Sequence, residues 1–244
     1  MIVKLHTVDS TNSYLKNWIQ KNSVKNYTII HAEKQTSGRG QRGNKWISEP
    51  YKNLLFSMFV EFNDFQINNQ FQLNQAISLG ITDALRPLIS YVQIKWPNDI
   101  MAGNYKIAGI LIENSIRGNN IKHSIIGVGI NVNQRIFPST LAQANSLSNL
   151  LNKDINRETL LINIQEALIK RIQQLINDPF IFEKEYLQNL YLFNKEAYFT
   201  LIKNKKQIKG RISGVTHEGL LIIKSEGKDY RFNFKEVVFD LLSI

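Results

Sequence analysis

Residues 38–46 read Gly-Arg-Gly-Gln-Arg-Gly-Asn-Lys-Trp, and this glycine-rich, basic stretch is the most informative feature of the chain. Its three glycines let the backbone turn sharply and approach a ligand closely. Arg39 and Arg42 add permanent cations that can meet phosphate or carboxylate oxygens. Trp46 is better placed to stack on a flat ligand than to fill a core. Taken alone, the stretch is open to three interpretations: a loop for an anionic ligand, an RNA-binding loop or a solvated basic loop.

The segments on either side predict a sheet-rich domain with a few helices. Apolar runs and alternation predict strands at residues 3–8, 27–32, 53–62, 92–96, 107–116 and 122–132. Helical spacing predicts a helix after Asp9 and Ser10, which offer N-caps, an amphipathic helix at 71–88, and further helices at 157–177 and 181–191. We expect Gly103-Asn104 to turn directly from the strand at 92–96 into the strand at 107–116. The loop at 34–52 lacks apolar periodicity and is long for a compact domain, which is typical of a binding loop or of disorder.

The pattern changes near residue 194, where short β-runs punctuated by glycines begin. They predict five strands, at 198–202, 207–215, 220–224, 228–234 and 237–241. Five short strands suit a small SH3-like barrel. We therefore expect an α+β protein of two domains, a mixed-sheet domain at 1–194 with helices packed on it and a barrel at 195–244.

The composition excludes several kinds of chemistry. The chain has 244 residues and no cysteine, which rules out disulfides, zinc-cysteine sites and a thiol nucleophile and is compatible with a reducing compartment such as the cytoplasm. No stretch approaches the roughly 20 apolar residues of a membrane span. The net charge of +10 suggests an acidic partner, yet the lysines are scattered and only 203–209 is dense. Charge alone does not identify the function.

A second motif, Lys95-Trp96-Pro97-Asn98-Asp99, lies at the C-terminal end of the strand predicted at 92–96. Proline fixes the turn and holds the preceding residue extended, so the polar side chains project from a rigid edge. Asp99 beside cationic neighbours is a candidate Mg²⁺ ligand, because Mg²⁺ takes one or two carboxylates and the phosphates of its nucleotide. A salt-bridged turn is the alternative interpretation.

Two further strands carry glycines in positions that leave room for a ligand. Lys106 precedes an apolar run, where a lysine is usually an edge-strand charge, and Gly109 follows three residues later. Gly127 and Gly129 lie on one face of a strand and leave a groove, with Asn131 at its mouth able to bind phosphate or ribose. Close packing of a helix is the alternative for the paired glycines.

Five motifs follow one another along the chain: Ser10-Thr11-Asn12, the 38–46 loop, the motif at 95–99, Lys106-Ile107-Ala108-Gly109 and Gly127-Val128-Gly129-Ile130-Asn131. With these motifs in the same order, the chain resembles the catalytic domain of biotin protein ligases along nearly its whole length. The resemblance implies that the loop closes over biotin and its adenylate. It implies a catalytic role for Arg39 and Lys106, with Lys106 contacting the reacting carboxylate and the α-phosphate.

The resemblance also implies three groups of binding residues. The biotin side comprises Ser10, Thr11, Asn12, Gln35, Gly38, Arg39, Gly40, Gln41, Lys106, Gly109, Gly127 and Gly129. The nucleotide side comprises Arg42, Asn44, Trp46, Lys95, Asn98 and Asn131. Asp99 is the expected Mg²⁺ ligand.

The activity that this family implies has two steps. Biotin is activated with MgATP to biotinyl-5′-AMP, and the biotin is then transferred to a lysine of a biotin carboxyl carrier domain. The enzyme's contribution is positioning plus positive charge, with no enzyme nucleophile. His6, His31, His123 and His217 are not at metal spacing and are expected to be structural or exposed. Family members that act as repressors carry an N-terminal helix-turn-helix, and we expect none here because Ser10 stands so near the start; a homodimer is left open.

The sequence departs from the family at two places. Gln41 and Asn44 stand where many members have arginine, which bears on how tightly the adenylate is retained. The C-terminal module offers Phe234-Lys235-Glu236-Val237 in place of the glycine-glutamate and arginine of some relatives, so no catalytic residue is assigned there. The alternative functions are a lipoate or octanoyl transferring enzyme of the same architecture, a basic single-stranded nucleic-acid-binding protein and a non-catalytic biotin-binding protein. The acceptor and the order of substrate binding are not determined by the sequence.

Overall fold

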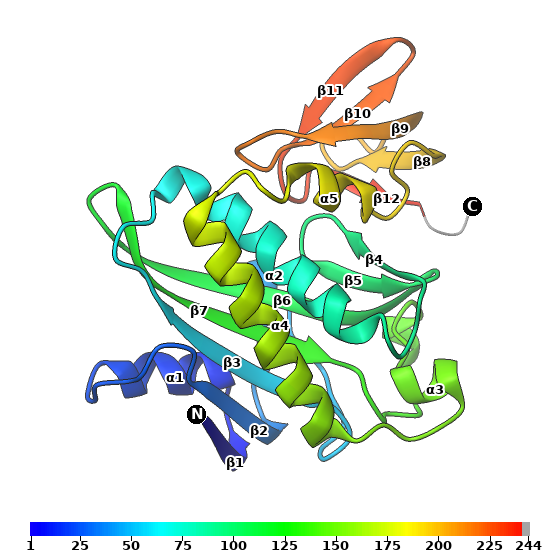
Figure 1. Ribbon diagram of the computed structural model, residues 1–244. Helices are drawn as coiled ribbons and strands as arrows, with labels where there is room; N and C mark the ends of the chain where they lie inside the picture. The colour runs from blue at the N-terminus through cyan, green and yellow to red at the C-terminus, as the bar shows by residue number, and fades with distance from the viewer. Residues whose placement is uncertain (241–244) are drawn as a thin grey trace.

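The computed structural model describes residues 1–240, without the side chain of Arg42. The larger part is a mixed sheet, as predicted, and its seven strands have the order β1-β2-β3-β7-β6-β5-β4 (Figure 1). Its strands are β1 (Ile2–Val8), β2 (Ile29–Gln35), β3 (Leu54–Glu61), β4 (Val92–Lys95), β5 (Asp99–Ala102), β6 (Tyr105–Arg117) and β7 (Asn120–Ile130). β1 and β2 are parallel, and the other neighbours pair antiparallel.

The two faces of this sheet carry different helices because side chains alternate along each strand. Ile30 of β2, Phe59 of β3 and Ile125 of β7 pack with Leu15 of α1 (Thr11–Ile19). Their chain neighbours point to the opposite face, which is covered by α2 (Gln70–Leu85) and α4 (Arg157–Asn177) (Figure 1). The glycines at 127 and 129 have the same parity as Ile125, so they open toward the α1 side.

α2 is buried on almost all sides. A helix was predicted for this segment correctly, but the exposed polar face of an amphipathic helix is absent from it. The helix lies between the sheet and α4, and Leu168 of α4 packs where Gly80 has no side chain. Arg171 of α4 forms ion pairs with Asp83 of α2 at 2.7 Å and with Glu185 of α5 (Glu183–Gln188) at 2.6 Å. The three residues lie on three separate helices, so the periodicity of any one segment does not predict these ion pairs.

The C-terminal part is a five-stranded antiparallel sheet of order β11-β10-β9-β8-β12. Its strands are β8 (Glu196–Leu201), β9 (Gln207–Val215), β10 (Leu221–Ser225), β11 (Lys228–Phe232) and β12 (Val237–Phe239). The five predicted strands are confirmed, although Leu241 of the last one lies outside the described residues. The Trp96 indole joins the two parts, since its Nε1 donates to the Gly219 carbonyl at 2.9 Å and its ring stacks on Phe234. The domain boundary at 194 stays a prediction.

Three expectations are corrected. β5 intervenes between β4 and β6, so Gly103, with φ +57°, turns from β5 into β6 and not from β4. Lys106 lies on β6, between β5 and β7 in the sheet, and an edge-strand charge is therefore the wrong interpretation of it. Ser10 occupies the N-cap of α1 but makes no side-chain capping hydrogen bond. Short segments at α3 (Leu147–Leu151) and at three 3₁₀ turns, Gln41–Gly43, Ile67–Asn69 and Ser139–Leu141, were not predicted.

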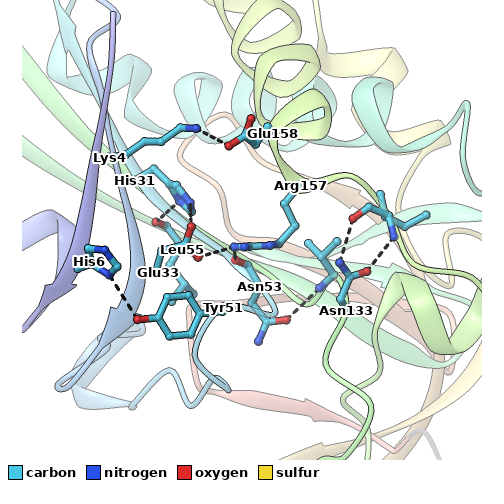
Figure 2. A network of polar contacts seen from close by, with 12 residues as sticks. Lys4, His6, His31, Glu33, Tyr51, Asn53, Leu55, Asn133, Arg157 and Glu158 are labelled. Carbon is cyan, nitrogen blue, oxygen red and sulfur yellow. Dashed lines mark hydrogen bonds and ion pairs between the residues drawn. The ribbon is translucent and has the colours of Figure 1, made fainter.

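A polar network fastens the chain just after the 38–46 loop (Figure 2). The Arg157 guanidinium, at the start of α4, contacts the Glu33 carboxylate at 2.7 Å and the Asn53 carbonyl at 3.2 Å. The Tyr51 amide donates to the Glu33 carbonyl at 3.0 Å, and the Asn53 carboxamide accepts from the Val132 amide at 3.0 Å. These contacts therefore hold the chain at residues 51–53, where it leaves the loop and enters β3. Across residues 1–240, no helix is long and apolar enough to cross a membrane.

Candidate functional site

A cavity of about 770 Å³ lies on the α1 side of the larger sheet. All of the predicted biotin residues except Gly38 line it, and so do Asp99 and the predicted nucleotide residues apart from Arg42 and Asn131. The side chain of Arg42 is outside the described part of the structure. Segments separated by more than 100 residues thus meet at one cavity.

The predicted loop has more local structure than its sequence suggested. The Gly40 amide donates to the Asn44 carbonyl at 2.7 Å, and the Trp46 amide donates to the Gly38 carbonyl at 2.9 Å. A side chain at Gly38 would collide with the Trp46 carbonyl, which explains the glycine there. Gly43 adopts φ +84°, a conformation that favours glycine. The loop therefore folds back on itself and presents Trp46 inward.

The Trp46 indole lies across Gly109 of β6 and Gly129 of β7. A methyl group built at either glycine would overlap the indole ring. The groove that the glycines were predicted to leave is present, and Trp46 lies in it. Its Nε1 is buried and has no hydrogen-bond partner within residues 1–240, which is unusual for a buried indole. The Lys106 ammonium lies 5.6 Å from the indole centroid, a favourable cation–π distance.

The charged end of the cavity is built from the 95–99 motif and Lys106. The Lys106 ammonium lies 2.6 Å from the Asp99 carboxylate. Lys95 is more buried, and this burial lowers the pKa of its ammonium; Asp99 acts in the opposite direction and Lys106 in the same direction. The Lys95 ammonium also lies 5.4 Å from the Phe239 ring centroid. Two cations and one carboxylate at a partly closed surface are suited to an anionic ligand and its counter-ion.

The opposite end of the cavity, around Thr11 and Asn12, is bordered by a continuous chain of polar contacts. The Gln35 carboxamide oxygen accepts from the Thr11 amide at 2.8 Å, and the Ser57 hydroxyl contacts the Thr11 hydroxyl at 2.7 Å and the Asn12 side-chain oxygen at 2.5 Å. The Asn12 side-chain nitrogen donates to the Glu113 carboxylate at 2.7 Å. Ser57 and Glu113 were missed because single polar residues within strands 53–62 and 107–116 carry no motif.

Asn98 and Asn131 use their side chains on the protein itself. The Asn98 amide donates to the Ile110 carbonyl at 2.8 Å while remaining in the cavity wall. Asn131 is buried outside that wall and donates to the Asn145 carbonyl at 3.0 Å. The structure therefore does not bring Asn131 to the mouth of the groove.

The C-terminal sheet also contributes to the cavity, which was not predicted. Its lining residues are Ile202, Phe234, Lys235, Val237, Val238 and Phe239. No role was predicted for the segment at 234–237, because contact between the two parts of the chain leaves no local pattern in the sequence.

Metal binding by protein groups alone finds little support here. Within residues 1–240, no group of three or more His, Cys, Asp or Glu side chains is placed to hold a metal ion. His31 contacts the Leu55 carbonyl, and His217 contacts Gln72 at 2.7 Å, so these two are structural as expected. A metal at Asp99 would take most of its ligands from the substrate and water.

Comparison with known proteins agrees with this geometry. The model of the biotin/lipoate A/B protein ligase family matches residues 5–131. The bifunctional ligase/repressor BirA of Escherichia coli (strain K12) is 31% identical over 231 residues, covering 93% of this chain and 70% of that protein. A biotin--[acetyl-CoA-carboxylase] ligase of Mycobacterium tuberculosis is 34% identical over 110 residues, 43% of this chain and 40% of that one. The solved biotin protein ligase from Aquifex aeolicus in complex with biotin and ATP superposes with a TM-score of 0.79 at 26% identity, covering 98% of this chain and 97% of that one.

Proposed function

The chain belongs to the biotin/lipoate A/B protein ligase family and is a biotin protein ligase, and from that premise we propose that its cavity holds biotin beside ATP and joins them. The observation that carries this proposal is that one cavity gathers the Ser-Thr-Asn segment, the 38–46 loop, the 95–99 motif, Lys106 and the strand glycines. The polar chain from Gln35 to Glu113 suits the neutral ring system of biotin. The Lys95, Asp99 and Lys106 end suits phosphate.

In the first step, a biotin carboxylate oxygen forms a bond to the α-phosphorus of ATP, and the bond from that phosphorus to the pyrophosphate oxygen breaks. Both reactants are anions, so their approach requires positive charge and fixed orientation. Lys106 would contact the carboxylate and the α-phosphate once its contact with Asp99 is exchanged for the substrate. Arg39 supplies a second cation from the loop.

In the second step, the amine of an acceptor lysine attacks the carbonyl carbon of biotinyl-5′-AMP. The new amide forms as AMP leaves with the electrons of the broken C–O bond, and the amine proton passes to water. Lys106 and Lys95 would stabilise the departing phosphate. We propose a biotin carboxyl carrier domain as the acceptor.

The donor set fits Mg²⁺ of the kind that accompanies a nucleotide. Asp99 offers one carboxylate in the cavity wall, and Mg²⁺ commonly takes only one or two carboxylates besides phosphate and water oxygens. When bound there, the ion would supply charge neutralisation at the phosphates. Asp99 would hold the ion, and Lys95, whose pKa is lowered by burial, would remain beside it.

The proposal is tested by assaying the full chain for biotin-dependent exchange of labelled pyrophosphate into ATP, and then for transfer of labelled biotin to a carrier domain. Lipoate and octanoate in place of biotin provide the matched controls for the related activities. Exchange and transfer with biotin and not with the other two acids are expected. Binding of biotin without pyrophosphate exchange would indicate that the protein binds biotin but does not catalyse its activation.

A further inference from the structure

Glu113 of β6 joins α1 and the 38–46 loop, the two segments that frame the end of the cavity around Thr11 and Asn12. Its Oε2 accepts from the side-chain Nδ2 of Asn12 of α1 at 2.7 Å, and its Oε1 accepts from the Arg39 guanidinium of the loop at 2.6 Å. Glu113 itself does not line the cavity within the described part of the chain, whereas Asn12 and Arg39 do. Any influence of Glu113 on a ligand must therefore pass through these two side chains.

The Asn12 carboxamide is held from both ends. It is 2% exposed, and its oxygen accepts from the Ser57 hydroxyl while its nitrogen faces Glu113. It also lies directly against Gly127, where any side chain would overlap it. A buried amide with a donor on one side and a carboxylate on the other has one favourable orientation.

The Arg39 side chain is one of two points, with the Trp46 indole, at which the loop contacts the rest of the domain. Its guanidinium contacts Glu113 and also donates to the Ser13 hydroxyl at 3.2 Å. Glu113 thus presents two acceptor oxygens to two donors, one on a rigid helix and one on the loop. A carboxylate accepts at both ends, and a carboxamide of the same shape cannot, because one end would be a second donor.

We propose that Glu113 is a positioning residue that sets the biotin end of the cavity by orienting Asn12 and Arg39 from one carboxylate. The inference rests on the proposed function. The proposed contacts of Asn12 with biotin would be made both before and during the reaction, so Glu113 would contribute through Asn12 to the binding of biotin. Arg39 supplies charge to the first step and keeps its contact with the Ser13 hydroxyl when Glu113 is replaced, so the effect on the rate should be the smaller one. Loss of Glu113 should therefore raise KM for biotin more than it lowers kcat.

The main test is Glu113→Gln, with Glu33→Gln as the matched control. Glu33 is similarly exposed, with 24% of its side chain accessible against 28% for Glu113, and forms an ion pair of 2.7 Å with Arg157 away from the cavity (Figure 2). In biotin-dependent pyrophosphate exchange, Glu113→Gln should raise KM for biotin about tenfold or more, because charge-assisted hydrogen bonds are lost. KM for ATP and kcat should stay within about threefold. Glu33→Gln should leave all three constants close to wild type.

Three outcomes overturn the inference. An unchanged biotin KM in Glu113→Gln removes it, as does an equal rise in Glu33→Gln, which would indicate general destabilisation. A parallel loss of kcat would place Glu113 in the chemical step. If the wild type shows no biotin-dependent exchange at all, the proposed function fails and this inference fails with it, a result distinct from the other three.

A second pair of variants keeps the test valid if Glu113→Gln does not fold. Asn12→Asp places a carboxylate against Glu113, so its biotin KM should rise and should fall again at lower pH, where one carboxyl group of the pair takes up a proton. Combining Asn12→Asp with Glu113→Gln restores a donor and acceptor, and should recover part of the loss. A KM with the pH dependence of the wild type, or additive losses in the double variant, would contradict direct coupling.

Discussion

The Lys106 ammonium and the Asp99 carboxylate lie 2.6 Å apart across the β5–β6 pair. One was predicted to contact the reacting carboxylate and α-phosphate, and the other to hold Mg²⁺, yet in this structure each satisfies the other. In the proposed reaction, substrate binding exchanges this ion pair for other contacts. An anionic phosphate for Lys106 and a cation for Asp99 would replace both halves of the pair at once, which would couple nucleotide binding to metal binding.

Replacement of Lys106 by alanine should abolish most of the adenylate formation. Removing one preorganised charge from a transition state typically costs about 10² to 10³ in rate. Lys106→Ala should lower biotin-dependent pyrophosphate exchange by that factor, and thermal unfolding should stay close to wild type. Lys122→Ala, at an exposed position on β7, is the control. Near-normal exchange in Lys106→Ala would mean that Lys95 suffices.

Replacement of Asp99 by asparagine should change the dependence on Mg²⁺. Asparagine keeps an oxygen ligand but removes the charge, so the site would bind the ion more weakly. We expect the Mg²⁺ concentration for half-maximal exchange to rise about tenfold, with rate recovered at high Mg²⁺. Exchange titrated with MgCl₂ at saturating biotin and ATP measures this. A proportional fall in rate at every Mg²⁺ concentration would instead indicate that Asp99 serves Lys106 alone.

The sequence predicted the fold well where the signal is local. The bounds of α4 and of β9 match their predicted ranges, because apolar spacing and Asp178-Pro179 mark the helix and flanking turn residues mark the strand. β5 was missed because four residues beside a proline carry little periodicity. The buried circumference of α2 could not be foreseen, since it depends on α4 packing over it.

The site residues were likewise predicted where a local motif marks them and missed where it does not. Motif residues such as Asn12, Lys95 and Lys106 were predicted and lie together. Glu113 was not, because its importance comes from facing Asn12 and Arg39 across the fold and not from its sequence neighbours. The contribution of Phe239 depends equally on how the C-terminal sheet meets the larger one.

Buried His31 should make stability fall in mild acid. Burial lowers its pKa below the ordinary 6.5, partly offset by the Leu55 carbonyl and Glu33, while Arg157 and Lys4 lower it further. Between these two pKa values the unfolded chain binds a proton at this histidine and the folded chain does not. The contribution of His31 to the free energy of unfolding is therefore fully present above about pH 7. It decreases below about pH 6.5, by up to about 1.4 kcal/mol per pH unit.

Urea denaturation at pH 7.5 and pH 5.5 measures this difference. Glutamine can still donate to Leu55, so His31→Gln should reduce the loss of stability at pH 5.5. Burial also lowers the pKa of His123, with Glu61 opposing, which makes His123→Gln the matched comparison. An identical pH dependence in His31→Gln and wild type would exclude His31 as the cause.

The loop at 38–46 should be protected when both substrates are present. Its contacts with the rest of the domain run through Arg39 and the Trp46 indole, and ligand-driven ordering of such a segment is a common switching mode. Trypsin should cleave the free protein after Arg39, Arg42 or Lys45, and biotin with ATP should slow that cleavage. Mass spectrometry of the fragments identifies the site. Equal cleavage rates in both states would argue against a closing loop.

Gln41 should leave the adenylate less firmly held than an arginine would. Gln41 lines the cavity wall, and a glutamine can donate a hydrogen bond to a phosphate without adding charge. A hydrogen bond to a charged group contributes roughly 1.5 to 3 kcal/mol net, and charge-assisted bonds are about twice as strong as neutral ones. Gln41→Arg should therefore slow release of biotinyl-5′-AMP by about tenfold, measured by chasing preformed intermediate with excess unlabelled biotin. Asn44→Arg is the comparison at the second departure. If the release rate is unchanged in Gln41→Arg and reduced in Asn44→Arg, retention depends on the later loop position, and Gln41 is not the determinant.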